Sequence, residues 1–290
     1  MLTSHAEHNS VFLPTMTAAR RLGIERLVLD READGALAYA PAQLERAVVV
    51  VNAVSNVDGR RLANLATLVR DAHARGGIVV LDAAQAVPHA VDLLQGTEAD
   101  AICWSGHKAY APTLGVVVAR RELIDRLDVG FVGGGMVSDV REQDFDLLPD
   151  DPASKLEPGL QAWGEIVGLR AALGWLEGLR LGDATPGAHL ESLGRRLYEG
   201  LAEVPGVTLL NRGPSSIVSL YAPRQDSHRL AVFLSRQRIM VRSGYFCVHH
   251  ELRERLGLPP LLRLSLGLHS TATEVDAAVQ ALDRLMRGLG

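Results

Sequence analysis

The chain has 290 residues, of which 47% are hydrophobic and 22% charged, and its formal net charge at pH 7 is −4. This balance is ordinary for a globular protein and provides no basic surface for nucleic acid. No apolar run approaches the ~18 residues that a membrane span needs, and the first residues do not form a signal peptide. The two cysteines suit a reducing compartment. We therefore expect a cytoplasmic protein that binds neither nucleic acid nor membranes.

Short apolar runs alternate with helical patterns in the first part of the chain. The apolar runs predict strands at residues 26–29, 48–51, 77–81, 101–104 and 116–119. Between and after them, helices are expected at residues 41–47, 62–72 and 123–127. Helices between buried strands are typical of βαβ units, so we expect an α/β fold with a mostly parallel sheet flanked by helices.

The regular pattern lapses between residues 130 and 158, where three glycines precede acidic and proline-containing sequence. We interpret this stretch as a long functional loop. A long helix with one apolar face follows and is expected to end near Gly182. The sequence therefore predicts a large domain over residues 1–182.

A smaller C-terminal α/β domain is predicted over residues 183–290, with a hinge at residues 183–187. Its expected elements are helices at residues 190–201 and 230–237, strands near residues 207, 217, 239–242 and 263–266, and a final helix. The final helix is expected to begin at the capping box Thr271-Ala272-Thr273-Glu274.

Asp82 and Lys108 each follow a predicted buried strand. Carboxyl ends of parallel strands share one edge of a sheet, where open α/β folds bind ligands. A carboxylate and an amine at such an edge suit pyridoxal 5'-phosphate (PLP): the amine forms a Schiff base, and the carboxylate keeps the pyridine nitrogen protonated. Lys108 and Lys155 are the only lysines. The alternatives are that Lys108 is a surface side chain and that Asp82 is a helix cap.

Three further polar residues are candidates for the same site. Gln85 lies three residues after Asp82, Asn56 follows the strand at residues 48–51, and His8 carries a ring that could stack on a cofactor. Their alternatives are a surface glutamine, ordinary turn chemistry for Asn56 and a solvent-exposed histidine near the terminus.

Cys247 lies in the segment Arg242-Ser-Gly-Tyr-Phe-Cys247-Val-His249-His250. Nearby arginine and histidine favour the thiolate, which is the nucleophilic form of cysteine. The alternatives are a buried structural cysteine and a metal site with the two histidines, but no other Cys/His spacing supports a metal, so we expect none. Cys103, inside a predicted strand, is interpreted as structural.

Six segments together resemble the class V aminotransferase superfamily of fold-type I PLP enzymes, and within it the cysteine desulfurase/selenocysteine lyase group. In family order they are Glu7-His8-Asn9, Ser55-Asn56-Val57-x-Gly59, Asp82-Ala83-Ala84-Gln85-Ala86-Val87-Pro88-His89, Ser105-Gly106-His107-Lys108, Arg242-Ser243-Gly244-x-x-Cys247 and Arg263-x-Ser265. The resemblance implies the fold-type I transferase architecture, PLP as cofactor and a homodimer.

The resemblance also implies a role for each candidate. Lys108 would hold the cofactor covalently. Around it, Asp82 would pair with the pyridine nitrogen, Gln85 with the phenolic oxygen, His8 with the ring face, Asn56 with the ring oxygen and substrate carboxylate, and Ser105 and His107 with the phosphate. Arg263 would bind the substrate carboxylate, with Arg242 beside it, and Cys247 would attack the substrate sulfur.

The implied reaction converts L-cysteine to L-alanine and leaves a persulfide on Cys247 that passes to a sulfur-acceptor protein. Two alternatives remain at this point. One is another class V aminotransferase or lyase that uses Lys108, namely a selenocysteine lyase, a C–S lyase or a transaminase. The other is a non-catalytic remnant or partner subunit that binds PLP weakly.

The sequence departs from the family pattern on the phosphate side. The family's N-terminal segment, with a Gly-Thr-Thr phosphate loop, has no counterpart. Leu160 stands where the family has a threonine that reaches the neighbouring subunit's phosphate, and two usual family glycines are changed or missing around residues 110–115. We therefore expect weakened phosphate binding.

Overall fold

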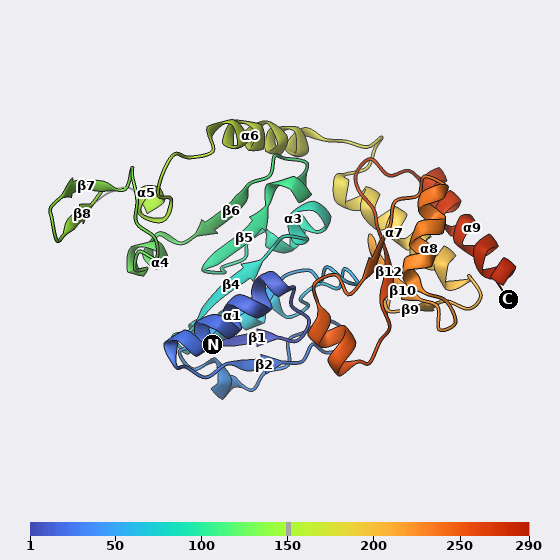
Figure 1. Cartoon of the computed structure of the whole chain (residues 1–290), viewed down its shortest axis with the longest axis horizontal. Coiled ribbons are helices and arrows are strands. Elements are labelled where there is room, and N and C mark those ends of the chain that lie inside the picture. The colour runs from blue at the N-terminus through green and yellow to red at the C-terminus, as the bar shows by residue number, and fades with distance from the viewer. Residues whose placement is uncertain (149–151, 290) are drawn as a thin grey trace.

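The computed structural model describes residues 1–148 and 152–289. Its first part is a six-stranded sheet in the order β2-β1-β3-β4-β5-β6 (Figure 1). The strands are β1 (Leu2–Ser4), β2 (Leu27–Leu29), β3 (Val48–Asn52), β4 (Ile78–Asp82), β5 (Ala101–Ser105) and β6 (Gly115–Ala119). All neighbours are parallel except β5 and β6, which are antiparallel. The predicted mostly parallel sheet is confirmed.

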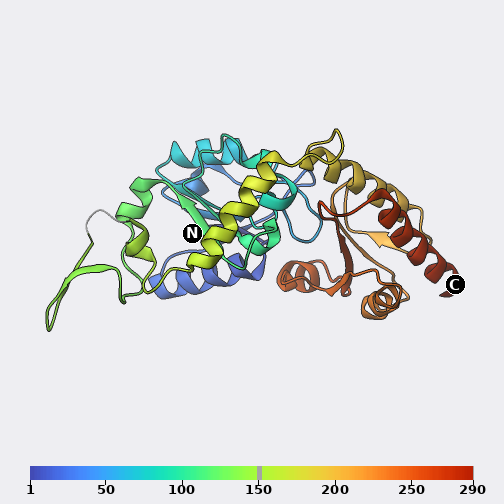
Figure 2. The same cartoon turned by 90° about the horizontal axis from the view of Figure 1, so that it is seen from above.

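Helices on both faces cover the central strands of this sheet. They are α1 (Asn9–Leu22), η1 (Pro41–Leu44), α2 (Leu65–His73), α3 (Ala86–His89), η2 (Val91–Leu94), η3 (Gly106–Ala109) and α4 (Arg121–Arg126). The helices α1 and α2 lie on opposite faces (Figure 2). Val49, Val51, Val79 and Leu81 are fully buried at the centre of this core, which is why these short valine-rich runs form the central strands.

The first two elements, β1 and α1, were not predicted. A three-residue strand is too short to show a pattern, and Pro14 inside α1 disguises the helix. The helix begins where the His8 side chain accepts a hydrogen bond from the Ser10 backbone, and it ends at Gly23, whose φ is 62°.

The prediction of one long loop over residues 130–158 is wrong. Strands β7 (Val137–Val140) and β8 (Phe145–Leu147) form a hairpin that projects from the body (Figure 1), and α5 (Pro152–Leu156) follows. The charged residues that hid the strands stabilise them, because Arg141 pairs with Asp144 and Asp146 across the turn. Residues 149–151 of the predicted loop lie outside the described residues.

The predicted long helix is present as α6 (Trp163–Gly178), but it ends before the expected Gly182 and its expected apolar face is not buried. Trp163 is 59% exposed and Trp175 is 48% exposed. The neighbouring strand β6 lies at the edge of its sheet, and its Val117 is 65% exposed. Both elements thus expose apolar side chains, which we refer to together as the α6–β6 surface.

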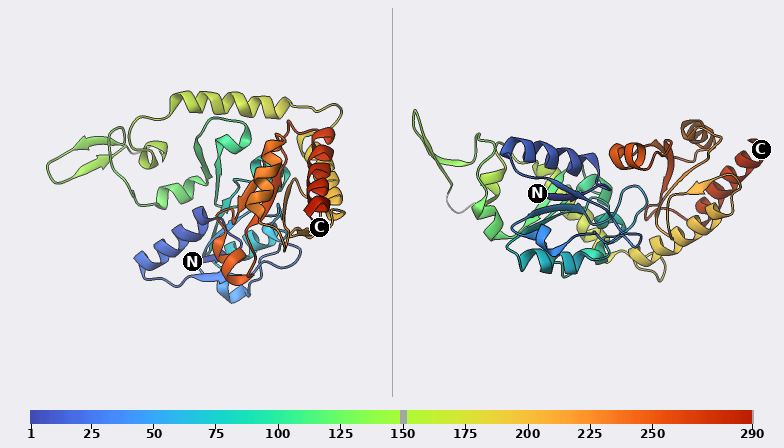
Figure 3. Two further views of the ribbon diagram at one scale, coloured as in Figure 1. Left: turned by 45° about the vertical axis from the view of Figure 1, so that its right-hand side comes forward. Right: turned by 90° about the horizontal axis from the view of Figure 1, so that it is seen from below.

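The C-terminal part is a four-stranded antiparallel sheet in the order β11-β12-β10-β9. Its elements are α7 (Pro186–Ala202), β9 (Thr208–Leu209), β10 (Ile217–Tyr221), α8 (Ser227–Arg236), β11 (Arg242–Gly244), η4 (His250–Arg255), β12 (Leu261–Ser265) and α9 (Ala272–Leu289). The strand predicted at residues 239–242 begins later, at Arg242. The predicted capping box is confirmed, since Thr271 and Glu274 exchange side-chain to backbone hydrogen bonds. Figure 3 shows this sheet beside the first one.

The segment after β3 joins the two sheets. The Val57 carbonyl accepts a hydrogen bond from Ser219, and the Asp58 carbonyl accepts one from Asn211 at 2.8 Å. Gly59 has a φ of 66°, and a side chain there would meet the Ser215 hydroxyl. Glycine therefore allows this close approach.

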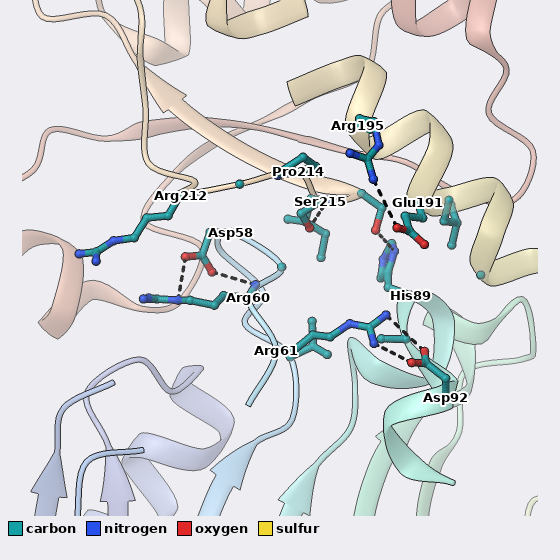
Figure 4. Close-up of a pocket in the computed structure, with 18 of the residues that line it drawn as sticks. Asp58, Arg60, Arg61, His89, Asp92, Glu191, Arg195, Arg212, Pro214 and Ser215 are labelled. Carbon is teal, nitrogen blue, oxygen red and sulfur yellow. Dashed lines mark hydrogen bonds and ion pairs between the residues drawn. The ribbon is translucent and has the colours of Figure 1, made fainter. Parts of the chain in front are cut away.

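A cavity of about 620 Å³ lies at this junction (Figure 4). Its charged lining is largely self-paired, in the ion pairs Arg60–Asp58, Arg61–Asp92 and Arg195–Glu191. None of the predicted site residues lines it. No described helix is long and apolar enough to cross a bilayer.

Candidate active site

The ends of β3, β4 and β5 bring the central candidates together. Asn52 and Cys103 are the register neighbours of Asp82 on the two flanking strands. The chain continues from β5 through Ser105 into η3, which carries Lys108. As predicted, Asp82 and Lys108 therefore lie at the same edge of the parallel sheet.

The Lys108 amine is half-buried, and its surroundings favour a reactive, uncharged form. Burial lowers the pKa of Lys108, Asp82 raises it, Arg263 lowers it and Cys247 raises it. These influences place four predicted site residues within electrostatic reach of one another. In the described part of the chain, no hydrogen bond ties up the Lys108 amine. A desolvated amine of this kind is a better nucleophile than an exposed lysine.

His8 presents a neutral ring to the same edge. Burial lowers the pKa of His8, and the Lys108 charge lowers it further, while Asp82 raises it and Arg263 lowers it. Its Nδ1 accepts the Ser10 backbone hydrogen bond at 3.1 Å. The ring is therefore held at the start of α1 in its uncharged form, as stacking on an aromatic cofactor requires.

A buried ion pair next to the end of β3 stabilises this edge of the sheet. The Glu7 side chain is fully buried and pairs with Arg31, whose side chain is 5% exposed. Glu7 also accepts two hydrogen bonds from Asn52, at 2.7 and 2.8 Å, and one from Ser4. This network fixes the turn before His8 to the end of β3, beside Asp82. Sequence reasoning quoted Glu7 in a motif but assigned it no role.

Arg263 reaches the site from the other sheet. It lies on β12, its Nη1 donates to the Asn56 carbonyl at 2.6 Å, and its Nε is buried without a hydrogen-bond partner among the described residues. Burial lowers the pKa of Arg263 to about 10, with Arg242 lowering it further and Cys247 opposing that. Arg242 is its register partner on β11. An arginine with an unsatisfied buried donor suits an incoming carboxylate.

Cys247 is exposed and lies in a strained loop at the mouth of the site. Its φ is 61°, and that of Phe246 is 49°; both values are uncommon for residues other than glycine. The Cys247 carbonyl accepts a hydrogen bond from the Asn9 backbone at 2.7 Å, which joins the loop to α1. The loop that carries Cys247 is therefore fixed beside the start of α1, and the Cys247 side chain acts electrostatically on Lys108.

The remaining candidates are less closely connected. Gln85 immediately precedes α3, Ser105 ends β5, and His107 is exposed in η3. No hydrogen bond links these side chains to the other candidates within the described residues, so their cofactor contacts stay predictions. Cys103 is partly buried on β5, and burial raises the pKa of its thiol.

The described residues contain no group of three or more His, Cys, Asp or Glu side chains that could hold a metal ion. His249 and His250 instead contact Asn9 and the Phe12 ring, respectively. The alternative of a metal site at Cys247 therefore gains no support from the geometry.

His89 is a further neighbour of the site, and its role was not apparent from the sequence. Its Nδ1 is 2.9 Å from the Ser216 hydroxyl, so it links the two sheets. Burial lowers the pKa of His89 to about 4, and Arg263 and Lys108 lower it too. His89 is therefore neutral at pH 7.

This histidine predicts an acid-sensitive fold. An unfolded histidine has a pKa near 6.5. Between this pH and about 4, His89 is protonated in the unfolded chain but stays neutral in the folded protein. The free energy of unfolding should fall as the pH drops from about 6.5 towards 4, by up to about 3 kcal/mol from this side chain. Urea unfolding across this range should show a smaller loss in His89→Gln than in the wild type. Equal losses would contradict the prediction.

Comparison with known proteins identifies the family. Residues 1–278 match the family model described as Aminotransferase class-V. The chain belongs to this family. Among curated class V relatives, a cysteine desulfurase of Dickeya dadantii is 34% identical over all of this chain and 71% of its own length. A probable cysteine desulfurase 2 of Mycobacterium leprae is 31% identical over all of this chain and 70% of its own length.

Solved structures agree with the class V fold. The cysteine desulfurase CsdA from Escherichia coli superimposes with a TM-score of 0.87 and 28% identity, covering 99% of this chain and 72% of CsdA. The apo cysteine desulfurase from Thermococcus onnurineus gives a TM-score of 0.86 at 28% identity, with the same coverage. The prediction of the fold-type I transferase architecture is thereby confirmed.

Proposed function

We propose that this protein is a PLP-dependent cysteine desulfurase that converts L-cysteine to L-alanine and passes the sulfur through Cys247 to an acceptor protein. The observation that carries the proposal is the convergence of an amine, a carboxylate, an arginine and a thiol: Asp82, Arg263 and Cys247 all act on the Lys108 amine. The similarity to curated cysteine desulfurases supports it.

The residues present fit PLP. The Lys108 amine makes no hydrogen bond in the described chain, and only Oδ1 of Asp82 is engaged, by the Ala84 backbone at 2.9 Å. Lys108 would hold the cofactor, Asp82 its pyridine nitrogen and His8 its ring face. Gln85 would reach the phenolic oxygen, and Ser105 and His107 the phosphate. Bound PLP supplies an electron sink for carbon acids.

The other half of the site binds substrate and takes the sulfur. Arg263 would bind the substrate carboxylate through its unpartnered Nε, with Asn56 and Arg242 beside it. The Cys247 thiolate would attack the substrate sulfur, so that an S–S bond forms as the C–S bond breaks. The electron pair of the C–S bond stays with the carbon and is protonated to give alanine. An acceptor thiolate then removes the outer sulfur from the persulfide.

Replacing Cys247 tests the reaction separately from cofactor binding. Cys247→Ala should keep the visible absorbance of bound PLP, and it should lose alanine release from L-cysteine together with the persulfide, by at least about 10³-fold. Persulfide labelling followed by mass spectrometry gives the second readout. Cys103→Ala is the matched control and should retain both activities. Undiminished alanine formation in Cys247→Ala would contradict the role of Cys247 as sulfur acceptor. Undiminished consumption of L-cysteine that yields a keto acid in place of alanine would instead support a C–S lyase or transaminase.

Three organisational features complete the proposal. Residues 1–182 form the cofactor-binding domain and residues 183–290 the small domain, in keeping with the two separate sheets. The protein is a homodimer, and the exposed apolar α6–β6 surface supports this. The location is cytoplasmic, in keeping with two free cysteines.

A further inference from the structure

We propose that Phe246 is a positioning residue that fixes the Arg263 guanidinium for the substrate carboxylate, and so makes the site selective for α-amino acids over simple amines. The proposal rests on the function argued above. It starts from the position of the ring: the Arg263 guanidinium carbon lies 4.6 Å from the centre of the Phe246 ring. At this distance the aromatic face attracts the cation and limits its orientation.

Phe246 is joined to Arg263 by a second route. The Asn56 side chain donates to the Phe246 carbonyl at 2.8 Å, and the Arg263 Nη1 donates to the Asn56 carbonyl at 2.6 Å. The Phe246 ring and backbone, the Asn56 amide and the Arg263 guanidinium therefore form a closed ring of contacts, which we call the circuit; it spans the two sheets. Asn56 is 7% exposed, so its bonds are protected from competing water.

This circuit determines which arginine donor remains available. One face of the guanidinium is covered by the ring, and Nη1 is occupied by the Asn56 carbonyl. The buried Nε has no partner in the described structure. An unsatisfied buried donor costs free energy, and a carboxylate in the guanidinium plane would satisfy it. A ligand without a carboxylate would leave Nε unpaired, which is a strong basis for discrimination.

The backbone shows that this arrangement is held against a local cost. Phe246 has a φ of 49°, which a bulky residue rarely adopts. Two hydrogen bonds hold the loop there, one to the Phe246 carbonyl from Asn56 and one to the Cys247 carbonyl from Asn9. The same loop thus places the aromatic ring on Arg263 and the Cys247 thiol at the mouth of the site.

The test compares two ligands that differ only in the carboxylate. L-Alanine and ethylamine are titrated into the PLP-loaded protein, and the visible absorbance of bound PLP reports binding without catalysis. Phe246→Leu and Phe246→Met, whose side chain is longer and unbranched, should weaken L-alanine binding about 3- to 30-fold. Both should leave ethylamine binding within about 2-fold of the wild type. Phe246→Tyr keeps an aromatic face and should bind L-alanine as tightly as the wild type does.

Tyr245→Phe is the control, because it changes the neighbouring aromatic residue and removes only a hydroxyl that donates to Leu258. It should bind both ligands as the wild type does. Equal weakening of both ligands in the Leu and Met variants, or no weakening of L-alanine, would overturn the positioning role while leaving the proposed function intact. A wild-type protein that shows no absorbance of bound PLP would overturn the proposed function and this inference with it.

Discussion

Lys108→Ala should abolish the visible absorbance of protein-bound PLP and lower alanine formation from L-cysteine by at least about 10³-fold. Lys108 is the half-buried amine on which Asp82, Arg263 and Cys247 all act. Alanine removes the only group at this edge of the sheet that we assign to covalent cofactor attachment. Absorbance spectra of the purified variant after PLP addition and desalting provide the measurement, with alanine formation as the second readout.

The chain offers a matched control in its only other lysine. The Lys155 amine donates to the backbone carbonyls of Ile124 and Asp125, so it stabilises the contact between α5 and α4. Lys155→Ala should keep both the absorbance and the activity. Retention of a PLP band in Lys108→Ala, or its loss in Lys155→Ala, would contradict the assignment.

Glu7→Ala should reduce the free energy of unfolding by about 3–5 kcal/mol, because it leaves the buried Arg31 guanidinium without its counter-charge. It also leaves the hydrogen-bond donors of Asn52 and Ser4 without the carboxylate that accepts from them in the wild type. Urea unfolding at pH 7, followed by circular dichroism, measures the change. The turn before His8 should loosen in any fraction that stays folded, so PLP affinity should fall as well.

An exposed ion pair provides the comparison. Asp283 and Arg287 pair at 2.9 Å on the surface of α9, and Asp283→Ala should cost less than about 1 kcal/mol. The double variant Glu7→Ala/Arg31→Met should be less destabilised than Glu7→Ala alone, because no buried charge remains. A Glu7→Ala variant no less stable than Asp283→Ala would show that the buried network contributes little.

The sequence predicted best where one short segment determines the structure. The valine-rich runs of β3 and β4 form the centre of the sheet because little else can bury them, and the Asp82 and Lys108 positions follow from the strand ends. The hairpin β7–β8 was mistaken for a loop because its strands are short and carry charged residues such as Arg141 and Asp146, so they show no apolar face. The first strand is too short to show a pattern, and Pro14 interrupts the helical pattern of α1.

Long-range partnerships account for what the sequence did not reveal at the site. Glu7 pairs with a residue 24 positions away, Asn56 bonds to Phe246 across 190 positions, and His89 meets Ser216 across 127. No local spacing encodes such contacts, because they depend on how the two sheets meet.

The position of α6 has a practical consequence for monitoring unfolding of this protein by tryptophan fluorescence. Two of the three tryptophans, Trp163 and Trp175, lie on that helix, and the third, Trp104, lies on β5. The four-stranded sheet and its helices contain no tryptophan. Intrinsic tryptophan emission therefore reports on the part of the chain that contains the six-stranded sheet, and separate melting of the C-terminal part would not change this emission. A tryptophan introduced near β10 would give that part its own signal.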